Sequence, residues 1–151
     1  MLGSGQSDRE AINRTIDAVY AAISGPAGKE RDWDAMRALY LPNARLTAIR
    51  ADGVESCTLE EYIASKRDFL VDNGFSEGTL VNRILVYGGI AHSWSSYSGG
   101  WTEANGTKGA TTGINSFQLM RQPDDSWRVL SILWQVANAD LPLPPEMEKA
   151  S

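Results

Sequence analysis

The region that most constrains the fold of this chain runs from Tyr87 to Trp134, where three long alternating segments follow one another. The first ends near Asn105-Gly106, and Asn-Gly between alternating segments is the strongest short-range hairpin signal, because both residues tolerate positive φ. The second covers 110–121 and is closed by Pro123-Asp-Asp, and the third covers 126–136. The pattern predicts three consecutive antiparallel strands, which contain four of the five tryptophans and the single histidine.

Helical signals occupy the N-terminal half of the chain. A capping-box pattern spans Ser7–Glu10, and apolar residues at helical spacing follow it until Ser24-Gly25-Pro26. A second helix is predicted over 32–40, with Asp32 as its N-cap, and a third over 58–73, opened by the capping box Thr58–Glu61. Further strands are predicted over 44–49, 54–57 and 79–87. Helices that precede a run of antiparallel strands indicate an α+β domain.

The length of 151 residues fits one domain. We expect disordered residues over 1–7, an α+β domain over 8–138 and a proline-rich C-terminal arm over 139–151, which cannot pair in a sheet centre. The net charge of −5 and the lack of a Lys/Arg run argue against nucleic acid as a partner. The sequence shows no signal peptide and no apolar segment near the roughly 20 residues that span a membrane. We therefore expect a cytoplasmic protein.

The last predicted strand is apolar on both of its faces. One face carries Trp127, Val129 and Leu133, and the other carries Leu130, Ile132 and Trp134. A sheet that packs helices on one face normally presents polar residues on the other. Either the C-terminal arm or a second subunit must cover the second face. We expect a homodimer through the outer sheet face at Leu130, Ile132 and Trp134, assisted by the arm.

Two segments resemble a known family. One is Asp-Trp-Asp-Ala-Met-Arg-Ala-Leu-Tyr-Leu-Pro-Asn-Ala-Arg-Leu over 32–46, and the other is Gly-Ile-Asn-Ser-Phe-Gln-Leu over 113–119 followed by Trp-Arg-Val over 127–129. With the order of elements, they resemble the nuclear transport factor 2-like (NTF2-like) superfamily over residues 8–138, above all its SnoaL-like and lumazine-binding-like proteins.

The resemblance implies an α+β cone of the cystatin-like superfold. A curved mixed or antiparallel sheet would wrap around three helices, with a pocket at its wide end and, in many relatives, a homodimer through its outer face. Members include isomerases, cyclases, dehydratases, epoxide hydrolases and proteins that only bind ligands. The fold does not choose among these activities.

The ketosteroid-isomerase branch of this family can be compared position by position. Tyr20 stands at its hydrogen-bonding tyrosine, and Asn115 falls near its oxyanion-hole aspartate. The position of its general base holds Ala48, so proton abstraction next to a carbonyl lacks its main group. The comparison disfavours that activity and leaves Tyr20 and Asn115 as hydrogen-bond donors that orient a polar ligand group.

Two residues are candidates for acid–base chemistry. His92 is the only histidine, a residue type that titrates near neutral pH; it is either a pocket acid or base, paired with Asp34 or Glu55, or a hydrogen-bonded residue of a sheet face. Asp34 lies in the first turn of a predicted helix, where a carboxylate is favourable in any case. It becomes a base only if it points into the cone. One His and one Cys supply no metal-ligand spacing, and no phosphate loop follows a strand, so we predict no metal and no cofactor.

Aromatic side chains dominate the predicted pocket, because small-molecule sites are mostly apolar with a few placed polar groups. The favoured function is binding of a small, largely hydrophobic or aromatic ligand, without identified chemistry. The alternatives are a SnoaL-like lyase, cyclase or isomerase that uses His92 or Asp34, and a structural dimer without a ligand. The predicted ligand-binding residues are Tyr20, Trp33, Tyr40, Trp94, Trp101, Asn115, Phe117 and Trp127.

Overall fold

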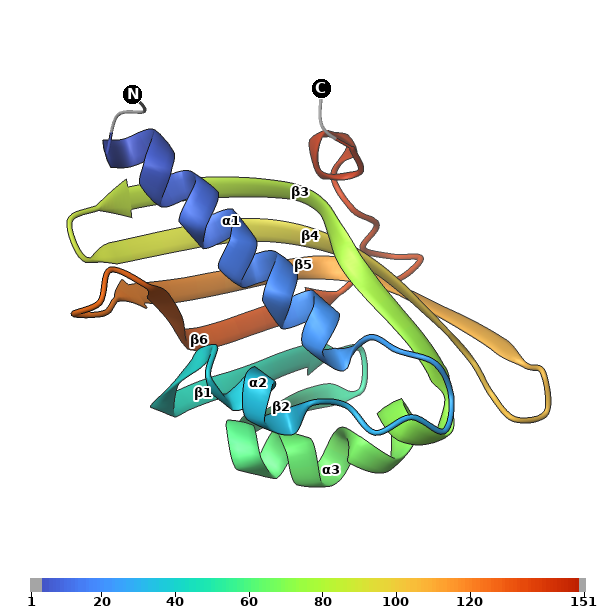
Figure 1. The fold of residues 1–151 in the computed structure, drawn as a ribbon. Helices are drawn as coiled ribbons and strands as arrows, with labels where there is room; N and C mark the ends of the chain where they lie inside the picture. The colour runs from blue at the N-terminus through green and yellow to red at the C-terminus, as the bar shows by residue number, and fades with distance from the viewer. Residues whose placement is uncertain (1–3, 150–151) are drawn as a thin grey trace.

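The computed structural model describes residues 4–149. In this range the chain forms three helices, six strands and one short 3₁₀ helix (Figure 1). In chain order they are α1 (Ser4–Ile23), α2 (Trp33–Arg37), β1 (Tyr40–Arg50), β2 (Gly53–Thr58), α3 (Leu59–Asp72), β3 (Gly74–Tyr87), β4 (Ile90–Thr102), β5 (Lys108–Arg121), β6 (Trp127–Val136) and η1 (Pro145–Met147).

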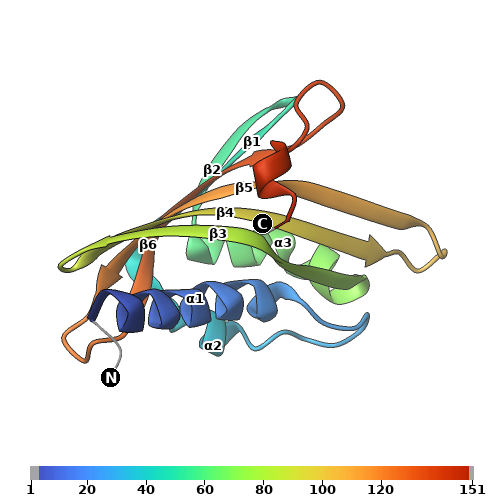
Figure 2. The ribbon, with the colours of Figure 1, turned by 90° about the horizontal axis from the view of Figure 1, so that it is seen from above.

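The six strands form one curled, unclosed sheet in the order β2-β1-β6-β5-β4-β3. β1 runs parallel to β6, while all other neighbours are antiparallel. The three helices lie on one side of the sheet, which we call the inner face, and η1 lies on the outer face (Figure 2). This is the predicted α+β cone, with β3 to β6 as the predicted meander. None of the helices within residues 4–149 is long and apolar enough to cross a membrane.

A β-bulge in β6 decides which of its side chains face the helices. On β5, Gln118 pairs with Ser131 and the next residue, Leu119, pairs with Val129, so Leu130 is an extra residue without a partner in that strand. A one-residue shift exchanges the two faces of a strand. Trp127 before the bulge and both Ile132 and Trp134 after it therefore all belong to the inner face, where they join the hydrophobic core. The prediction that Ile132 and Trp134 lie on the outer face is wrong.

A second bulge lies at Leu80 in β3. This strand also begins at Gly74, five positions before the predicted start at Thr79. The added segment matters for the site, because Phe75 and Glu77 alternate with exposed or half-buried neighbours and turn to the inner face. The capping residue Asn73 ends α3 at the position the sequence predicts.

Local signals place most element ends. Asp32 caps α2 by accepting a hydrogen bond from the Ala35 N–H at 3.0 Å, and Thr58 opens α3 with the predicted capping box. α1 begins at Ser4, three residues before the predicted cap, so residues 4–7 are helical; residues 1–3 lie outside the described range. In the β4–β5 turn only Gly106 has positive φ, at 86°, and the turn closes by a bond from the Glu103 N–H to the Thr107 oxygen.

The C-terminal arm covers part of the outer sheet face (Figure 2). Met147 in η1 is 2% exposed, and its carbonyl oxygen accepts a hydrogen bond of 2.6 Å from the buried Ser96 hydroxyl of β4. The arm is thus one of the two alternative covers that the sequence suggests for the outer face. The other end of this face, toward the β3–β4 turn, carries large exposed apolar side chains.

Candidate functional site

A cavity of about 590 Å³ lies between the inner sheet face and the three helices, and we call it the cone cavity. Its volume falls within the range of small-molecule sites, roughly 300–1,000 Å³. Nine aromatic side chains line it: Tyr20, Tyr40, Tyr62, Phe69, Phe75, Tyr97, Trp101, Phe117 and Trp134. Polar lining is sparse and consists of Arg50, Ser65, Lys66, Glu77, Thr111 and Asn115.

One hydrogen-bonded group in this cavity joins α1 to the sheet. The Asn115 amide donates to the Tyr20 hydroxyl at 2.8 Å, and the Tyr20 and Ser95 hydroxyls share a bond of 2.8 Å. When Ser95 donates in that bond, Tyr20 accepts twice and its own O–H is left for a ligand. Burial raises the pKa of Tyr20, so the phenol stays protonated and remains a donor.

Glu77 is the acidic residue of the cavity. Glu77 lines the cavity, and the residue is half-buried. The surrounding protein still desolvates its carboxyl and raises the pKa to about 7. Within residues 4–149 the carboxyl has neither an ion-pair partner nor a hydrogen-bond donor.

The backbone of Glu77 is held firmly. The Ser24 hydroxyl at the end of α1 accepts from the Glu77 N–H at 3.0 Å and donates to its carbonyl at 3.4 Å. Across the ladder stands Gly99, where an added Cβ would lie 3.2 Å from Glu77 Cγ and 3.0 Å from a backbone oxygen. The glycine therefore leaves the room that the acidic side chain occupies.

Four tyrosines line the cavity together with Glu77. Burial raises the pKa of Tyr20, Tyr40, Tyr62 and Tyr97, and the negative charge of Glu77 raises each of them further. All four phenols belong to residues that line the same cavity as Glu77. The acid therefore shares the cavity with tyrosines from α1, β1, α3 and β4.

Two cationic side chains also border the cavity. Lys66 of α3 is paired with Glu55 of β2, with 3.3 Å between Nζ and Oε1. Arg50 at the end of β1 forms no salt bridge within residues 4–149, and its charge acts on Tyr62 and Tyr97. Neither cation contributes to the pKa shift of Glu77, which arises from desolvation.

Five of the eight predicted ligand-binding residues line the cone cavity: Tyr20, Tyr40, Trp101, Asn115 and Phe117. Room for Trp101 is made by Gly109 on β5, where any Cβ would collide with the indole ring. The fold brings these five residues together from α1, β1, β4 and β5.

Three predicted tryptophans lie elsewhere. Trp33 packs at the edge of the core, with its indole N–H on Glu30, and Trp127 is a core residue beneath the Arg121 guanidinium, 4.7 Å from its ring centroid. Trp94 is 43% exposed and pairs with outer-face positions of β3 and β5. None of the three contributes to the cavity lining.

The two predicted acid–base residues do not enter the cavity either. His92 lies on the outer sheet face, where its Nε2 and the Ser116 hydroxyl are 3.0 Å apart. Asp34 is 93% exposed on α2 and forms a salt bridge of 2.9 Å with Arg37. The bulge-free alternation of β4 explains the position of His92, since Ser93 and Ser95 take the inner positions and are fully buried.

The sequence prediction missed Glu77, Tyr62 and Tyr97. The missing signal for Glu77 was the start of β3: alternation counted from Phe75 would have placed Glu77 on the same face as this aromatic residue. Tyr97 needs Gly113 opposite it, because an added Cβ there would overlap the phenol. That relation joins two strands and becomes visible only in the folded chain.

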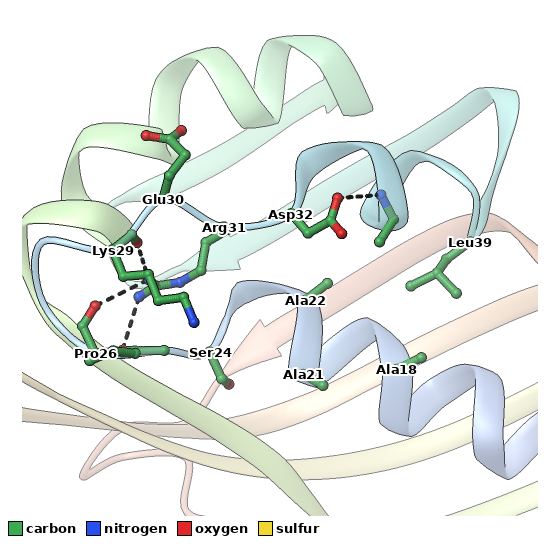
Figure 3. A pocket seen from close by; sticks show the side chains of 12 residues that line it. Ala18, Ala21, Ala22, Ser24, Pro26, Lys29, Glu30, Arg31, Asp32 and Leu39 are labelled. Carbon is green, nitrogen blue, oxygen red and sulfur yellow. Dashed lines mark hydrogen bonds between the residues drawn. The ribbon is translucent and has the colours of Figure 1, made fainter.

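A second hollow, of about 580 Å³, lies outside the cone between α1 and the loop to α2 (Figure 3). Alanines of α1 and Leu39 form much of it, and its buried charge is Arg31, 6% exposed. All five guanidinium N–H groups are used in bonds to backbone oxygens, so none remains to orient a ligand. The acceptors are Ile23, Gly25, Pro26, Lys29 and Leu70.

The described residues also offer no metal centre. Nowhere between residues 4 and 149 do three or more His, Cys, Asp or Glu side chains gather closely enough to hold a metal ion. The groups of the cavity that can contact a ligand are therefore the Tyr20 and Asn115 hydrogen-bond donors, the Glu77 carboxyl and the aromatic side chains.

No protein-family model matches the sequence, and no curated protein is a match. Solved structures are similar at low identity. An NTF2-like protein with a cystatin-like fold from Novosphingobium aromaticivorans is 17% identical, with a TM-score of 0.68 over 90% of this chain and 87% of that one.

Two further structures carry functional descriptions of their own. A candidate dehydratase of the NTF2-like family from Streptomyces avermitilis is 15% identical, with a TM-score of 0.68 over 89% of this chain and 99% of that one. The β subunit of a candidate aromatic-ring-hydroxylating dioxygenase from Novosphingobium aromaticivorans is 14% identical, with a TM-score of 0.69 over 94% and 99%. At these identities the likeness establishes the fold. The chain has the cone-shaped α+β fold of the NTF2-like superfamily.

Proposed function

We propose that this protein binds a small, largely hydrophobic or aromatic ligand in the cone cavity. The observation that carries the proposal is a cavity of about 590 Å³ with nine aromatic side chains and a few polar groups. Burial of a flat apolar ligand against such walls supplies binding energy, and the Tyr20 and Asn115 donors supply orientation. The carboxyl of Glu77, with a pKa of about 7, adds a titratable group at a fixed place.

A blocked cavity tests this proposal. Thr111→Trp places an indole into the lining, whereas Thr112→Trp adds the same bulk at the next position of β5, which alternation turns to the other face. Wild type and both variants are screened by thermal shift and calorimetry against aromatic and polycyclic compounds. We expect ligands to stabilise wild type and Thr112→Trp, by about 2.7 kcal/mol at 100 times Kd, and to lose at least tenfold in affinity for Thr111→Trp. Equal binding to Thr111→Trp, or no stabilising compound at all, contradicts the proposal.

We assign no lyase, cyclase or isomerase chemistry to His92 or Asp34. Both side chains lie outside the cavity that would hold the substrate, and a general acid or base must reach the reacting atom within hydrogen-bond distance or through one water. If turnover is found, the titratable group to test first is Glu77.

We further propose a homodimer through the outer sheet face, with a changed set of residues. Register places twelve side chains in one outer patch across β3 to β6: Arg83, Leu85, Tyr87, Ile90, His92, Trp94, Ser116, Gln118, Met120, Arg128, Ser131 and Leu133. Six of them are large exposed apolar residues, with Leu85 69% and Tyr87 83% exposed. Leu85, Tyr87, Ile90 and Met120 are neighbours in the pairing, while polar residues such as Ser116 and Gln118 lie between them and Leu133. Exposed apolar side chains gathered on one sheet face support a protein interface, and a second copy of the same face matches it in polarity.

A further inference from the structure

We propose that Glu77 is the counter-ion for a ligand that carries a protonated amine on an apolar or aromatic body. The inference rests on the proposed ligand binding in the cone cavity and narrows the ligand class. Its starting point is a carboxyl that borders the cavity without a partner within residues 4–149. Ser24 fixes its backbone and Gly99 gives it room, so its position is built into the fold.

The ionised form of the Glu77 carboxyl is unfavourable in this place because it has no counter-ion within residues 4–149. An ionised carboxylate away from water is unfavourable unless a charge pairs with it, and an isolated one takes up a proton instead. In agreement, burial raises the pKa of Glu77 to about 7. A ligand ammonium supplies the missing positive charge and hydrogen-bond donors, and the carboxyl then binds it as the ion.

The walls around Glu77 favour the same ligand. Aromatic rings attract cations through their negative faces, so a cavity that combines a carboxylate with several tyrosines is a good environment for a desolvated ammonium. Tyr20, Tyr40, Tyr62 and Tyr97, from α1, β1, α3 and β4, line the same cavity as the carboxyl. An anionic ligand group in this position would be repelled by the ionised carboxyl, while a neutral group would supply no positive charge to stabilise it.

The cationic groups near the cavity do not replace the ligand. Lys66 is paired with Glu55, and the charge of Arg50 acts on Tyr62 and Tyr97 without contributing to the shift at Glu77. These are the charged side chains that border the cavity beside Glu77. The carboxyl therefore keeps its capacity for an external cation.

Matched probes test the inference. Tryptamine is compared with its neutral propyl analogue, in which a methyl group replaces the ammonium, and with the corresponding propionate; the same three forms are made on a phenyl ring. Calorimetry at pH 8 should show the amines binding at least tenfold more tightly than the propyl analogues, with the propionates weakest. Glu77→Gln should remove this preference and leave the affinity of the propyl analogues within twofold of wild type. Glu103→Gln, beyond the end of β4, serves as the matched control and should behave as wild type.

Proton release gives a second readout on the unaltered protein. A bound ammonium drives Glu77 to its ionised form, so each binding event should release about 0.9 proton at pH 6, about 0.5 at pH 7 and about 0.1 at pH 8, which calorimetry in buffers of different ionisation enthalpy measures. The amine affinity should rise about tenfold from pH 6 to pH 8. His92→Gln should keep this dependence, because His92 lies on the outer face.

The outcomes separate the two proposals. Any of three results would overturn the amine inference and leave ligand binding standing. The propyl analogues bind as tightly as the amines, the preference for amines survives in Glu77→Gln, or binding at pH 6 releases no proton. Failure of the amines while neutral aromatic compounds bind would do the same. If none of these probes and no compound of the aromatic panel binds, the proposed function itself is overturned.

Discussion

Glu77 sets the chemistry of the cavity at the scale of a single residue. Its carboxyl belongs to the lining of the cone cavity, and desolvation raises its pKa from the ordinary 4.5 to about 7. The neutral acid is therefore favoured in the folded protein over a range in which the unfolded chain carries a carboxylate. This difference makes stability depend on pH in a defined direction.

Between about pH 4.5 and pH 7 the folded state holds a proton that the unfolded state has lost, so the stability of wild type falls as the pH rises. The fall ends above the folded pKa and amounts to about 3 kcal/mol, from a shift of roughly two and a half units at 1.36 kcal/mol each. Glu77→Gln lacks this contribution. Urea unfolding of both proteins at pH 4.5, 6 and 8.5 should show the variant gaining stability relative to wild type by that amount across the range. A constant difference between the two proteins would contradict the raised pKa.

At the scale of elements, the bulge at Leu130 governs the composition of both sheet faces. It turns Ile132, Trp134 and Val136 toward the helices and leaves Leu133 on the outer face, 46% exposed. Neighbouring residues of β6 thus belong to different surfaces, one inside the cavity and the other in the outer patch. Substitutions at 133 and 134 should have separate consequences.

Leu133→Asp should weaken self-association by at least tenfold and leave ligand binding unchanged, because a carboxylate is costly in an apolar interface. Trp134→Ala should change ligand affinity by at least fivefold and leave association unchanged, because it removes an indole from the cavity wall. Sedimentation equilibrium and calorimetry on each variant measure the two effects. The reverse pattern would mean that the bulge does not set the faces of β6 in this way.

At the scale of the whole molecule, the two faces of the sheet differ in what covers them. The inner face and the helices enclose the cone cavity, while the outer face is covered at one end by the C-terminal arm through Met147. The other end presents the outer patch, with Tyr87, Ile90 and Trp94 among its exposed apolar residues. Two copies related by a twofold axis would bury this patch against itself.

The dimer predicts a mass near twice 16.5 kDa in sedimentation at micromolar concentration. Trp94→Glu should shift the protein to monomer, since it places a charge in the patch, while Ala64→Glu on the exposed surface of α3 should leave the mass unchanged. Circular dichroism confirms that each variant is folded. A wild-type mass of 16.5 kDa at all concentrations would rule out the dimer.

Local patterns in the sequence determined the elements and their order. Asp32 and the Thr58–Glu61 box predicted two helix starts, and the turn signals near Asn105-Gly106 and Pro123 predicted the strands of the meander. These signals act over a few residues, through capping bonds and allowed φ values, so a single sequence is enough to identify them.

Which side chains meet in the cavity was decided by the tertiary structure. Strand alternation predicts faces only while pairing stays regular, and the bulges at Leu80 and Leu130 reverse it in β3 and β6. His92 and Asp34 carry suitable chemistry in sequence, yet the fold turns both away from the cavity. Alternation from Phe75 places Glu77 on the inner face, but its raised pKa comes from desolvation beside a cavity that residues of several elements form, and only folding brings these together.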